Sequence, residues 1–120
     1  MTARICDQMQ LDALLSLGGR ALSDQFVADL ARCETHFTKA LGVASTDKRQ
    51  GLELARRALH ELRGIALTVG ATSLSRQCAK AEAFCDLGHL QDVVEARAEI
   101  LATCDALTKL IRDYSEGTSL

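Results

Sequence analysis

The chain has 120 residues, a length typical of one domain, and is 48% hydrophobic and 25% charged. This balance suits a packed protein and excludes an intrinsically disordered chain. The net charge of -2 at pH 7 gives no support for nucleic-acid binding, which depends on concentrated Lys and Arg. Proline is absent and aromatic residues make up 3%. The core must therefore consist mainly of Leu, Ala, Val, Ile and Cys, a set that favours helices.

The beginning of the chain, up to Gly19, lacks the uninterrupted apolar region and the cleavage site of a secretory signal. No apolar run approaches the roughly 20 residues that a membrane-spanning helix needs. We therefore expect a cytoplasmic protein without membrane contact. We also expect it to be a monomer. The odd number of cysteines, without a Cys-x-x-Cys pair, indicates buried free thiols instead of disulfides or a metal site. These cysteines are Cys6, Cys33, Cys78, Cys85 and Cys104.

Glycines divide the sequence into five pieces of helical length, because glycine is favoured just past the end of a helix. No stretch alternates between apolar and polar residues as a strand would, and no linker is visible. We expect a single domain over residues 1–120. Its predicted helices cover residues 6–17, 21–41, 47–69, 72–87 and 90–114.

Apolar residues recur at intervals of three and four in each piece, as the buried face of a helix requires. The clearest stripe belongs to the third piece and contains Leu52, Ala55, Leu59, Leu62, Ala66 and Val69. The other stripes are Met9, Leu11, Leu14 and Leu15; Phe26, Leu30, Cys33, Phe37 and Leu41; Leu74, Cys78, Ala81 and Cys85; and Val93, Ile100, Cys104, Leu107 and Ile111.

The connections between the four long helices are short, so sequence neighbours must lie antiparallel. Ser45 or Thr46 is expected to cap the third helix, and Thr72 or Ser73 the fourth. The predicted fold is all-α, an antiparallel up-down-up-down four-helix bundle with a short additional N-terminal helix that covers one end.

His60 is the principal candidate for chemistry. At about 100° per residue it lies about 140° from the centre of the apolar stripe, on the outer side of the third helix. A histidine so placed can be a solvated surface residue, a metal ligand or a nucleophile, and the periodicity does not choose among them. The neutral imidazole has one nitrogen with a free lone pair, so it can accept a phosphoryl group.

The neighbours of His60 are consistent with an accessible site. Gly64, one turn further on, costs about 0.5 to 1 kcal/mol relative to alanine inside a helix. Close approach of a partner to the imidazole would explain it, and helix packing or simple tolerance would explain it equally well. Leu67 on the same face suggests a docking surface. Arg63 and Arg56 supply positive charge that a phosphoryl group would use.

Glu82 is a candidate partner for the second imidazole nitrogen. It lies at the flank of the apolar stripe of the fourth helix, from which it can face His60 across the groove between the two helices. A carboxylate there would fix the tautomer and stabilise a positively charged ring. His36, within the second long helix beside Phe37, and His89, which follows Gly88 and can stabilise the end of a helix, are weaker candidates. Three histidines so dispersed do not indicate a metal site.

This part of the sequence resembles the signature of histidine-containing phosphotransfer (HPt) domains of bacterial two-component phosphorelays. In that signature a His-x-Leu-Lys-Gly run is followed by Gly-Ala, a spaced Leu, a small residue and Glu or Gln. The spacing fits without a gap, and the length and helix order of nearly the whole chain fit as well. The matching residues are His60, Leu62, Arg63, Gly64, Gly70, Ala71, Leu74, Cys78 and Glu82.

The resemblance implies a phosphorelay intermediate without catalytic or autokinase activity of its own. His60 would accept a phosphoryl group on Nε2 from a receiver-domain aspartate and pass it to another receiver domain. Arg63 would take the place of the family's lysine near the phosphoryl oxygens, Gly64 would give clearance, and Glu82 would bond Nδ1. The partners would be receiver domains of response regulators and of a hybrid histidine kinase. No cofactor is expected in this chain, and Mg²⁺ would lie in the receiver's acidic pocket.

The chain departs from the family pattern on the face that would dock a partner. The residue after Gly64 is often serine in the family but is Ile65 here, and Leu67 stands where a small residue is common. Arg63 keeps the charge of lysine but has a planar, forked geometry. These differences concern partner selectivity more than the acceptor role.

Two other functions are compatible with the sequence. An adaptor or inhibitor would use the same face to dock a receiver domain or a histidine kinase without being phosphorylated. A metalloprotein built on a helical bundle is less well supported, because the Glu-x-x-His pairs of such sites are missing. No phosphate-binding glycine loop is visible either, which argues against phosphorylation directly from ATP.

Overall fold

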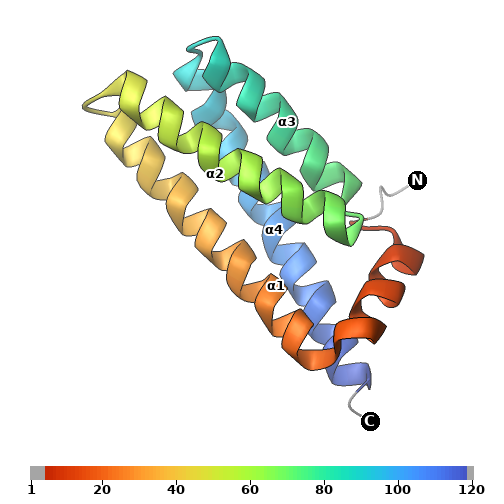
Figure 1. Ribbon diagram of the computed structural model, residues 1–120. Helices are drawn as coiled ribbons and strands as arrows, with labels where there is room; N and C mark the ends of the chain where they lie inside the picture. The colour runs from red at the N-terminus through yellow and green to blue at the C-terminus, as the bar shows by residue number, and fades with distance from the viewer. Residues whose placement is uncertain (1–4, 119–120) are drawn as a thin grey trace.

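The computed structural model describes residues 5–118 and consists mainly of four helices. These helices are α1 (Gln8–Ala44), α2 (Lys48–Val69), α3 (Thr72–Asp86) and α4 (Leu90–Thr118). Consecutive helices run antiparallel, and both α1 and α3 pack against α2 and α4 (Figure 1). The four helices thus enclose one core, which confirms the predicted all-α up-down-up-down bundle.

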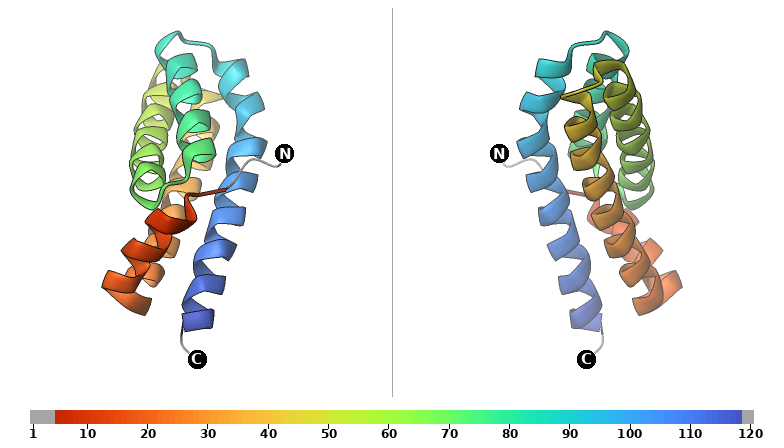
Figure 2. Two further views of the ribbon diagram at one scale, coloured as in Figure 1. Left: turned by 90° about the vertical axis from the view of Figure 1, so that its right-hand side faces the viewer. Right: turned by 90° about the vertical axis from the view of Figure 1, so that its left-hand side faces the viewer.

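The direction of α1 changes at Gly19, where φ is 62° and ψ is −152°. Most residues with a side chain avoid this conformation, so glycine permits the change of direction. Residues 8–18, which we call the N-terminal segment, form the predicted additional helix. This segment lies across the end of the bundle where α2 and α3 meet (Figure 2).

Hydrogen bonds fix the N-terminal segment to the end of α2. The backbone N–H of Asp7 donates to the carbonyl of Gly70 at 2.8 Å. The side-chain amide of Gln10 donates to the carbonyls of Leu67 and Thr68, both at 2.9 Å. Carbonyls in the last turn of a helix have no partner within that helix. The three bonds therefore tie this part of the chain to the end of α2, where the carbonyls of Leu67 and Gly70 also accept the backbone N–H groups of Gly70 and Thr72.

The side chains of the N-terminal segment correct one prediction. Leu11 and Leu15 are buried and Leu14 is half-buried, as expected. Met9, however, was predicted to be a core residue and is 83% exposed. The segment touches the bundle along one narrow side, so the residues buried there are one helical turn apart, and Met9 lies outside that line.

The predicted stripes of the long helices form the core. Every residue of the four stripes from α2, α3, α4 and the second part of α1 is buried, except Leu41, which is half-buried while the neighbouring Ala40 takes the interior position. The five cysteines are buried free thiols, as predicted. Burial raises the pKa of Cys33 to about 11 and that of Cys78 to about 12, so neither thiol ionises near neutral pH.

The predicted helix caps were wrong. Asp47 caps α2, its carboxylate accepting the Gln50 N–H at 3.1 Å, because the hydroxyls of Ser45 and Thr46 instead donate to carbonyls at the end of α1. The residue before α3 is Ala71, and no side chain caps that helix. The tight turn places Ala71 at the capping position, and alanine has no side-chain oxygen that could accept an N–H of α3.

The turn between α2 and α3 positions the surface that carries His60. Gly70 ends α2 in the left-handed conformation, with φ of 75°, as predicted for a glycine past a helix end. The Ala71 N–H then donates to the carbonyl of Ala66 at 2.7 Å. This short turn holds α3 antiparallel beside α2. Within residues 5–118, no helix combines the length and the hydropathy needed to cross a membrane.

Glu34 is a half-buried carboxyl group between α1 and α4. Its Oε1 is shielded from solvent and has no hydrogen-bond partner among the described residues. Burial, followed by the proximity of the Asp105 carboxyl and its charge, raises the pKa of Glu34 to about 7. If Glu34 and Asp105 were both ionised, neither would carry a proton to donate to the other, and their charges would repel. The site therefore favours the protonated form of Glu34.

We predict that Glu34 makes the stability of the bundle depend on pH. The raised pKa in the folded state means that protonated Glu34 stabilises the fold below its ordinary value of 4.5 and that this contribution is lost as the pH rises through about 7. Glu34→Gln cannot ionise, so it should raise the free energy of unfolding by about 1 kcal/mol above pH 7, an effect reduced by partial exposure to solvent.

Urea unfolding at about pH 5 and pH 8 would measure this effect as a gap between wild type and Glu34→Gln that opens with pH. Glu95→Gln, at an exposed position of α4, is the matched control and should follow the wild type. Parallel curves for wild type and Glu34→Gln would contradict the prediction.

Candidate functional site

His60 lies near the middle of α2 and projects from the bundle. Its side chain is 63% exposed, while Leu59 and Leu62 on the same helix are buried. The difference follows from the period of the helix, which turns His60 outward when its neighbours face the core. The structure thus places the imidazole on the outer side, as predicted.

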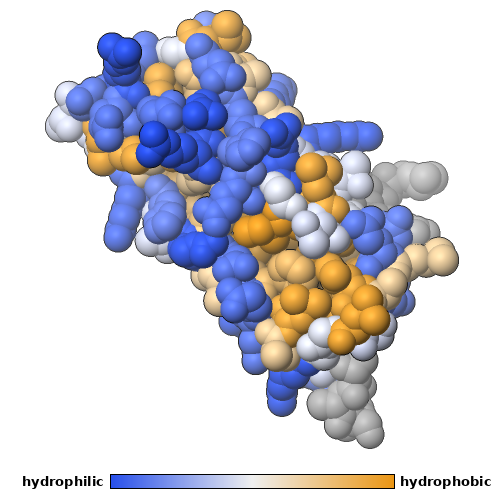
Figure 3. All heavy atoms as spheres, in the orientation of Figure 1, coloured by the Kyte–Doolittle hydropathy of each residue, from blue (hydrophilic) through white to orange (hydrophobic). Residues whose placement is uncertain are grey.

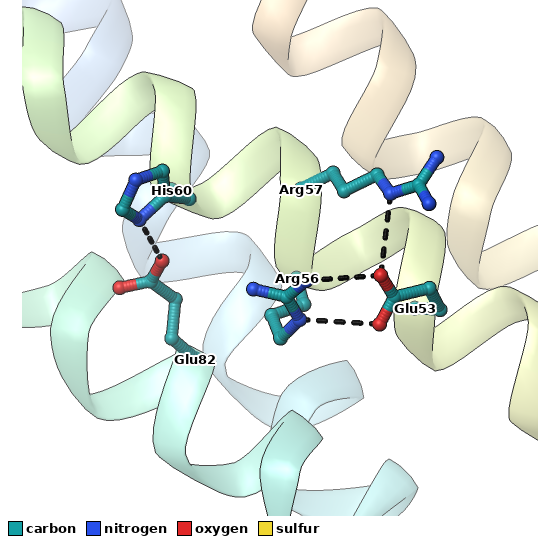
Figure 4. Close-up of polar contacts among 5 residues, drawn as sticks. All are labelled: Glu53, Arg56, Arg57, His60 and Glu82. Carbon is teal, nitrogen blue, oxygen red and sulfur yellow. Dashed lines mark hydrogen bonds and ion pairs between the residues drawn. The ribbon is translucent and has the colours of Figure 1, made fainter.

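Glu82 reaches His60 from α3. Its Oε1 lies 3.0 Å from Nδ1 of the imidazole (Figure 4). The Glu82 side chain is only 11% exposed, because α3 turns this position toward the groove next to α2. The two residues are 22 positions apart in the sequence, and the tight turn between the helices brings them together.

The contact with Glu82 determines the tautomer of the imidazole. An ionised carboxylate only accepts hydrogen bonds, so Nδ1 must carry the proton and donate it to Oε1. The lone pair of a neutral ring is then on Nε2. Figure 4 shows this second nitrogen of His60 on the side of the ring that faces away from Glu82. Nε2 has no hydrogen-bond partner within residues 5–118. The geometry leaves an accessible nitrogen nucleophile with its tautomer fixed.

Arg63 completes the group around Glu82. Its Nε donates to Oε2 of Glu82 at 3.0 Å, so both carboxylate oxygens have partners. Nη2 of Arg63 lies 3.1 Å from Nδ1 of His60, but two donor nitrogens form no hydrogen bond with each other. The guanidinium therefore lies on the Nδ1 side of the ring and holds Glu82 in place.

A second charged cluster lies on α2, one to two turns before His60. Glu53 accepts two hydrogen bonds from Arg56, at 3.1 and 2.9 Å, and one from Arg57 at 3.2 Å (Figure 4). The two arginines lower the pKa of the Glu53 carboxyl. Arg56, expected to add free positive charge beside His60, is thus paired. The three- and four-residue spacing from Glu53 could have indicated this pairing from the sequence.

The glycine and the apolar residues after His60 have different surroundings. A side chain added at Gly64 would meet nothing within 4 Å, so helix packing does not explain this glycine. Leu67 is 59% exposed, as expected for a surface residue. Ile65 was expected on the same face but is half-buried against the core, because it lies about 100° around the helix from Gly64.

The other histidines do not join the site. His36 is exposed on α1 and has no hydrogen-bond or ion-pair partner among the described residues. His89 stacks on Phe84 and pairs with Asp92, 3.4 Å away. Within residues 5–118, no three His, Cys, Asp or Glu side chains are grouped so that they could hold a metal ion.

Comparison with known proteins identifies the family. The family model described as Hpt domain matches residues 21–113, a range that includes His60, Arg63, Gly64 and Glu82 but not the N-terminal segment. No curated protein and no solved structure matches the chain. Because the family model covers more than half of the sequence, the chain belongs to the Hpt domain family, which implies a phosphotransfer role in a two-component phosphorelay and interaction with receiver domains.

Proposed function

We propose that this protein is a phosphorelay intermediate that carries a phosphoryl group on Nε2 of His60. The observation that carries the proposal is the hydrogen bond from Nδ1 of His60 to Glu82, at 3.0 Å. It leaves the lone pair on the exposed side of the ring, where a receiver domain can reach it. The protein would act as a carrier and would need no autokinase activity.

The transfer step uses the imidazole as the nucleophile. Nε2 attacks the phosphorus of a receiver's aspartyl phosphate, the N–P bond forms, and the P–O bond to the aspartate breaks to release its carboxylate. The ring becomes positively charged as the bond forms. The carboxylate of Glu82 stabilises this charge through the Nδ1 hydrogen bond. In the reverse step a second receiver's aspartate takes the phosphoryl group, and the ring returns to its neutral form.

Arg63 contributes to this step through Glu82. Its ion pair with Oε2 at 3.0 Å holds the carboxylate in the orientation that His60 needs. The family resemblance gives this position a second role at the phosphoryl oxygens. To take it, the guanidinium would have to swing from the Nδ1 side of the ring toward Nε2.

The partners follow from the chemistry. We propose receiver domains of response regulators and of a hybrid histidine kinase as donor and acceptor, in the cytoplasm, with this chain acting as a monomer. The Mg²⁺ that neutralises charge on the transferring group would belong to the receiver domain.

The alternative is an adaptor or inhibitor that docks a receiver domain or a histidine kinase without being phosphorylated. The exposed Leu67, two helical turns after His60 on α2, favours a docking role and is equally compatible with phosphotransfer. The two functions differ in whether binding leads to a covalent phosphohistidine.

The first prediction from the proposed function is that His60 is the only site labelled by a phosphorylated receiver. Incubation with radiolabelled receivers from the same organism should give an acid-labile, base-stable phosphate on the wild type and none on His60→Gln. Circular dichroism should give the same helicity for both, because the imidazole is largely outside the core. Labelling that persists in His60→Gln would refute the acceptor role. Receiver binding without transfer by the wild type would favour the adaptor.

A second prediction concerns Glu82. Glu82→Gln keeps an acceptor oxygen for Nδ1 but removes the charge that stabilises the phosphorylated ring. Because a charge-assisted hydrogen bond is about twice as strong as a neutral one, the single-turnover rate of transfer should fall by about tenfold or more. Glu61→Gln removes a carboxylate next to His60 that pairs with Arg32 instead. Equal rates for both variants would contradict a specific role for Glu82.

A third prediction tests whether Gly64 allows the close approach of a receiver domain or is merely tolerated in the helix. Gly64→Ala should stabilise α2 by about 0.5 to 1 kcal/mol, since alanine is the better helix former and the added methyl group meets no atom. If a receiver approaches this backbone, the same methyl group should slow transfer by about tenfold or more.

Gly42→Ala is the matched control for this experiment. Gly42 is also an exposed helical glycine without neighbours, so the substitution should stabilise the protein without changing transfer. A normal transfer rate for Gly64→Ala would mean that this glycine is merely tolerated.

A further inference from the structure

Arg56 is bound by Glu53 on the same face of α2 as His60. Arg56 and His60 are four positions apart, which makes their side chains neighbours on the surface of the helix. The guanidinium of Arg56 donates two hydrogen bonds to the Glu53 carboxylate, at 3.1 and 2.9 Å, and such a paired contact fixes its orientation. A cation one turn from His60 is therefore committed to another anion.

The third guanidinium nitrogen of Arg56 is directed toward the site. Nε and Nη2 bind Glu53, and Figure 4 shows the remaining nitrogen on the side toward His60 and Glu82. The hydrogen bonds to Glu53 and its charge raise the pKa of Arg56, and the carboxylates of Asp86 and Glu82 act more weakly in the same direction. Arg56 thus lies within electrostatic reach of the carboxylate that bonds to His60.

The surroundings of the pair leave room for the guanidinium to move. The Arg56 and Glu53 side chains are 38% and 42% exposed, and both line a hollow between the start of α2 and the end of α3. Figure 3 shows mainly hydrophilic surface over this end of the molecule. Arg57, the other partner of Glu53, extends to the side away from His60 (Figure 4). Within residues 5–118 the Arg56 side chain has no hydrogen-bond or ion-pair partner besides Glu53.

We infer that Glu53 is a positioning residue that holds Arg56 away from the phosphoryl group on His60 and so keeps this group ready to leave. The inference rests on the proposed function. When the group leaves, the N–P bond to Nε2 breaks, a P–O bond to the receiver's aspartate forms, and the ring returns to its neutral form. An arginine bound to the phosphoryl oxygens would stabilise the phosphohistidine relative to the aspartyl phosphate. The carboxylate of Glu53 competes with the phosphoryl group for that arginine.

A purely structural role of Glu53 makes a different prediction. Its spacing from Arg56 and Arg57 stabilises α2, as oppositely charged pairs three and four residues apart do in any helix. That contribution changes the free energy of unfolding and does not depend on whether His60 carries a phosphoryl group. The division of phosphoryl groups between this protein and a receiver therefore distinguishes the two roles.

The test uses Glu53→Gln, which keeps the size of the side chain and removes the charge that holds Arg56. The full chain is labelled on His60 with phosphoramidate, a small phosphoryl donor, and mixed with the receiver domain of the same organism that exchanges fastest with the wild type. Rapid quenching measures the equilibrium ratio of phosphohistidine to aspartyl phosphate before the receiver loses phosphate to water. This ratio should rise about two- to fivefold in Glu53→Gln, the range expected for one exposed ion pair.

Glu61→Gln is the matched control for the lost charge. Glu61 also pairs with an arginine, Arg32, which keeps a second partner in Asp29 at 3.4 Å, so the ratio should stay at the wild-type value. Glu53→Gln/Arg56→Gln should also return the ratio to the wild-type value, because the released arginine is then missing. An unchanged ratio in Glu53→Gln would overturn the inference. A rise that persists in the double variant, or that Glu61→Gln reproduces, would overturn it as well.

The phosphoramidate step separates this inference from the proposed function. Phosphoramidate needs no partner protein, so it should label His60 equally in the wild type and in Glu53→Gln. Absence of this labelling, together with a lack of exchange with every receiver, would refute the proposed function itself. Normal labelling and exchange with the same ratio in both proteins would overturn only the role of Glu53.

Discussion

The turn between α2 and α3 sets the geometry on which the site depends. Gly70 adopts the left-handed conformation that glycine reaches without strain, and the chain reverses within two residues. His60 and Glu82 lie eleven residues before and eleven residues after Ala71. Because a helix rises 1.5 Å per residue, each lies about 16 Å from the turn, at the same height on neighbouring antiparallel helices. A shift of one residue would rotate the side chain by about 100° and remove the carboxylate from the imidazole.

The sequence was sufficient for those features that depend on helical periodicity. The buried stripes, the outward position of His60 and the helix ends at Gly70 and Gly88 follow from spacing, and the structure agrees.

Features that depend on a choice between similar groups were not predictable. Ser45, Thr46 and Asp47 are all good caps, and only the path of the chain selects Asp47. Met9 fits a buried stripe in isolation, but which side of the N-terminal segment meets the bundle is decided at Gly19. Glu82 was predictable as a partner from its position, whereas the ion pair from Arg63 was not, because a long side chain can reach several groups.

The charged side chains around His60 form ion pairs with one another. Glu53 holds Arg56 and Arg57, Glu61 pairs with Arg32, and Glu82 holds Arg63. Nε2 of His60 therefore faces solvent without a committed cation. This suits a carrier, since a guanidinium fixed on the phosphoryl oxygens would stabilise the phosphorylated state and slow the exit of the group to the next receiver. Arg63 is the cation of these pairs that could move toward a phosphoryl group on His60. To do so, its guanidinium would have to leave Glu82.

If receiver domains exchange phosphoryl groups with His60 as proposed, the chemistry is the same for each of them, and discrimination among them has to come from the surface around the site. The N-terminal segment is well placed to provide that surface, because its position is fixed by hydrogen bonds to backbone carbonyls of Leu67, Thr68 and Gly70. These bonds do not involve the exposed side chains of Met9 and Leu17. These two side chains can therefore change in sequence without moving the segment, the turn or the contact between His60 and Glu82. The bonds that hold the N-terminal segment and the contact between His60 and Glu82 thus involve different residues of the same fold.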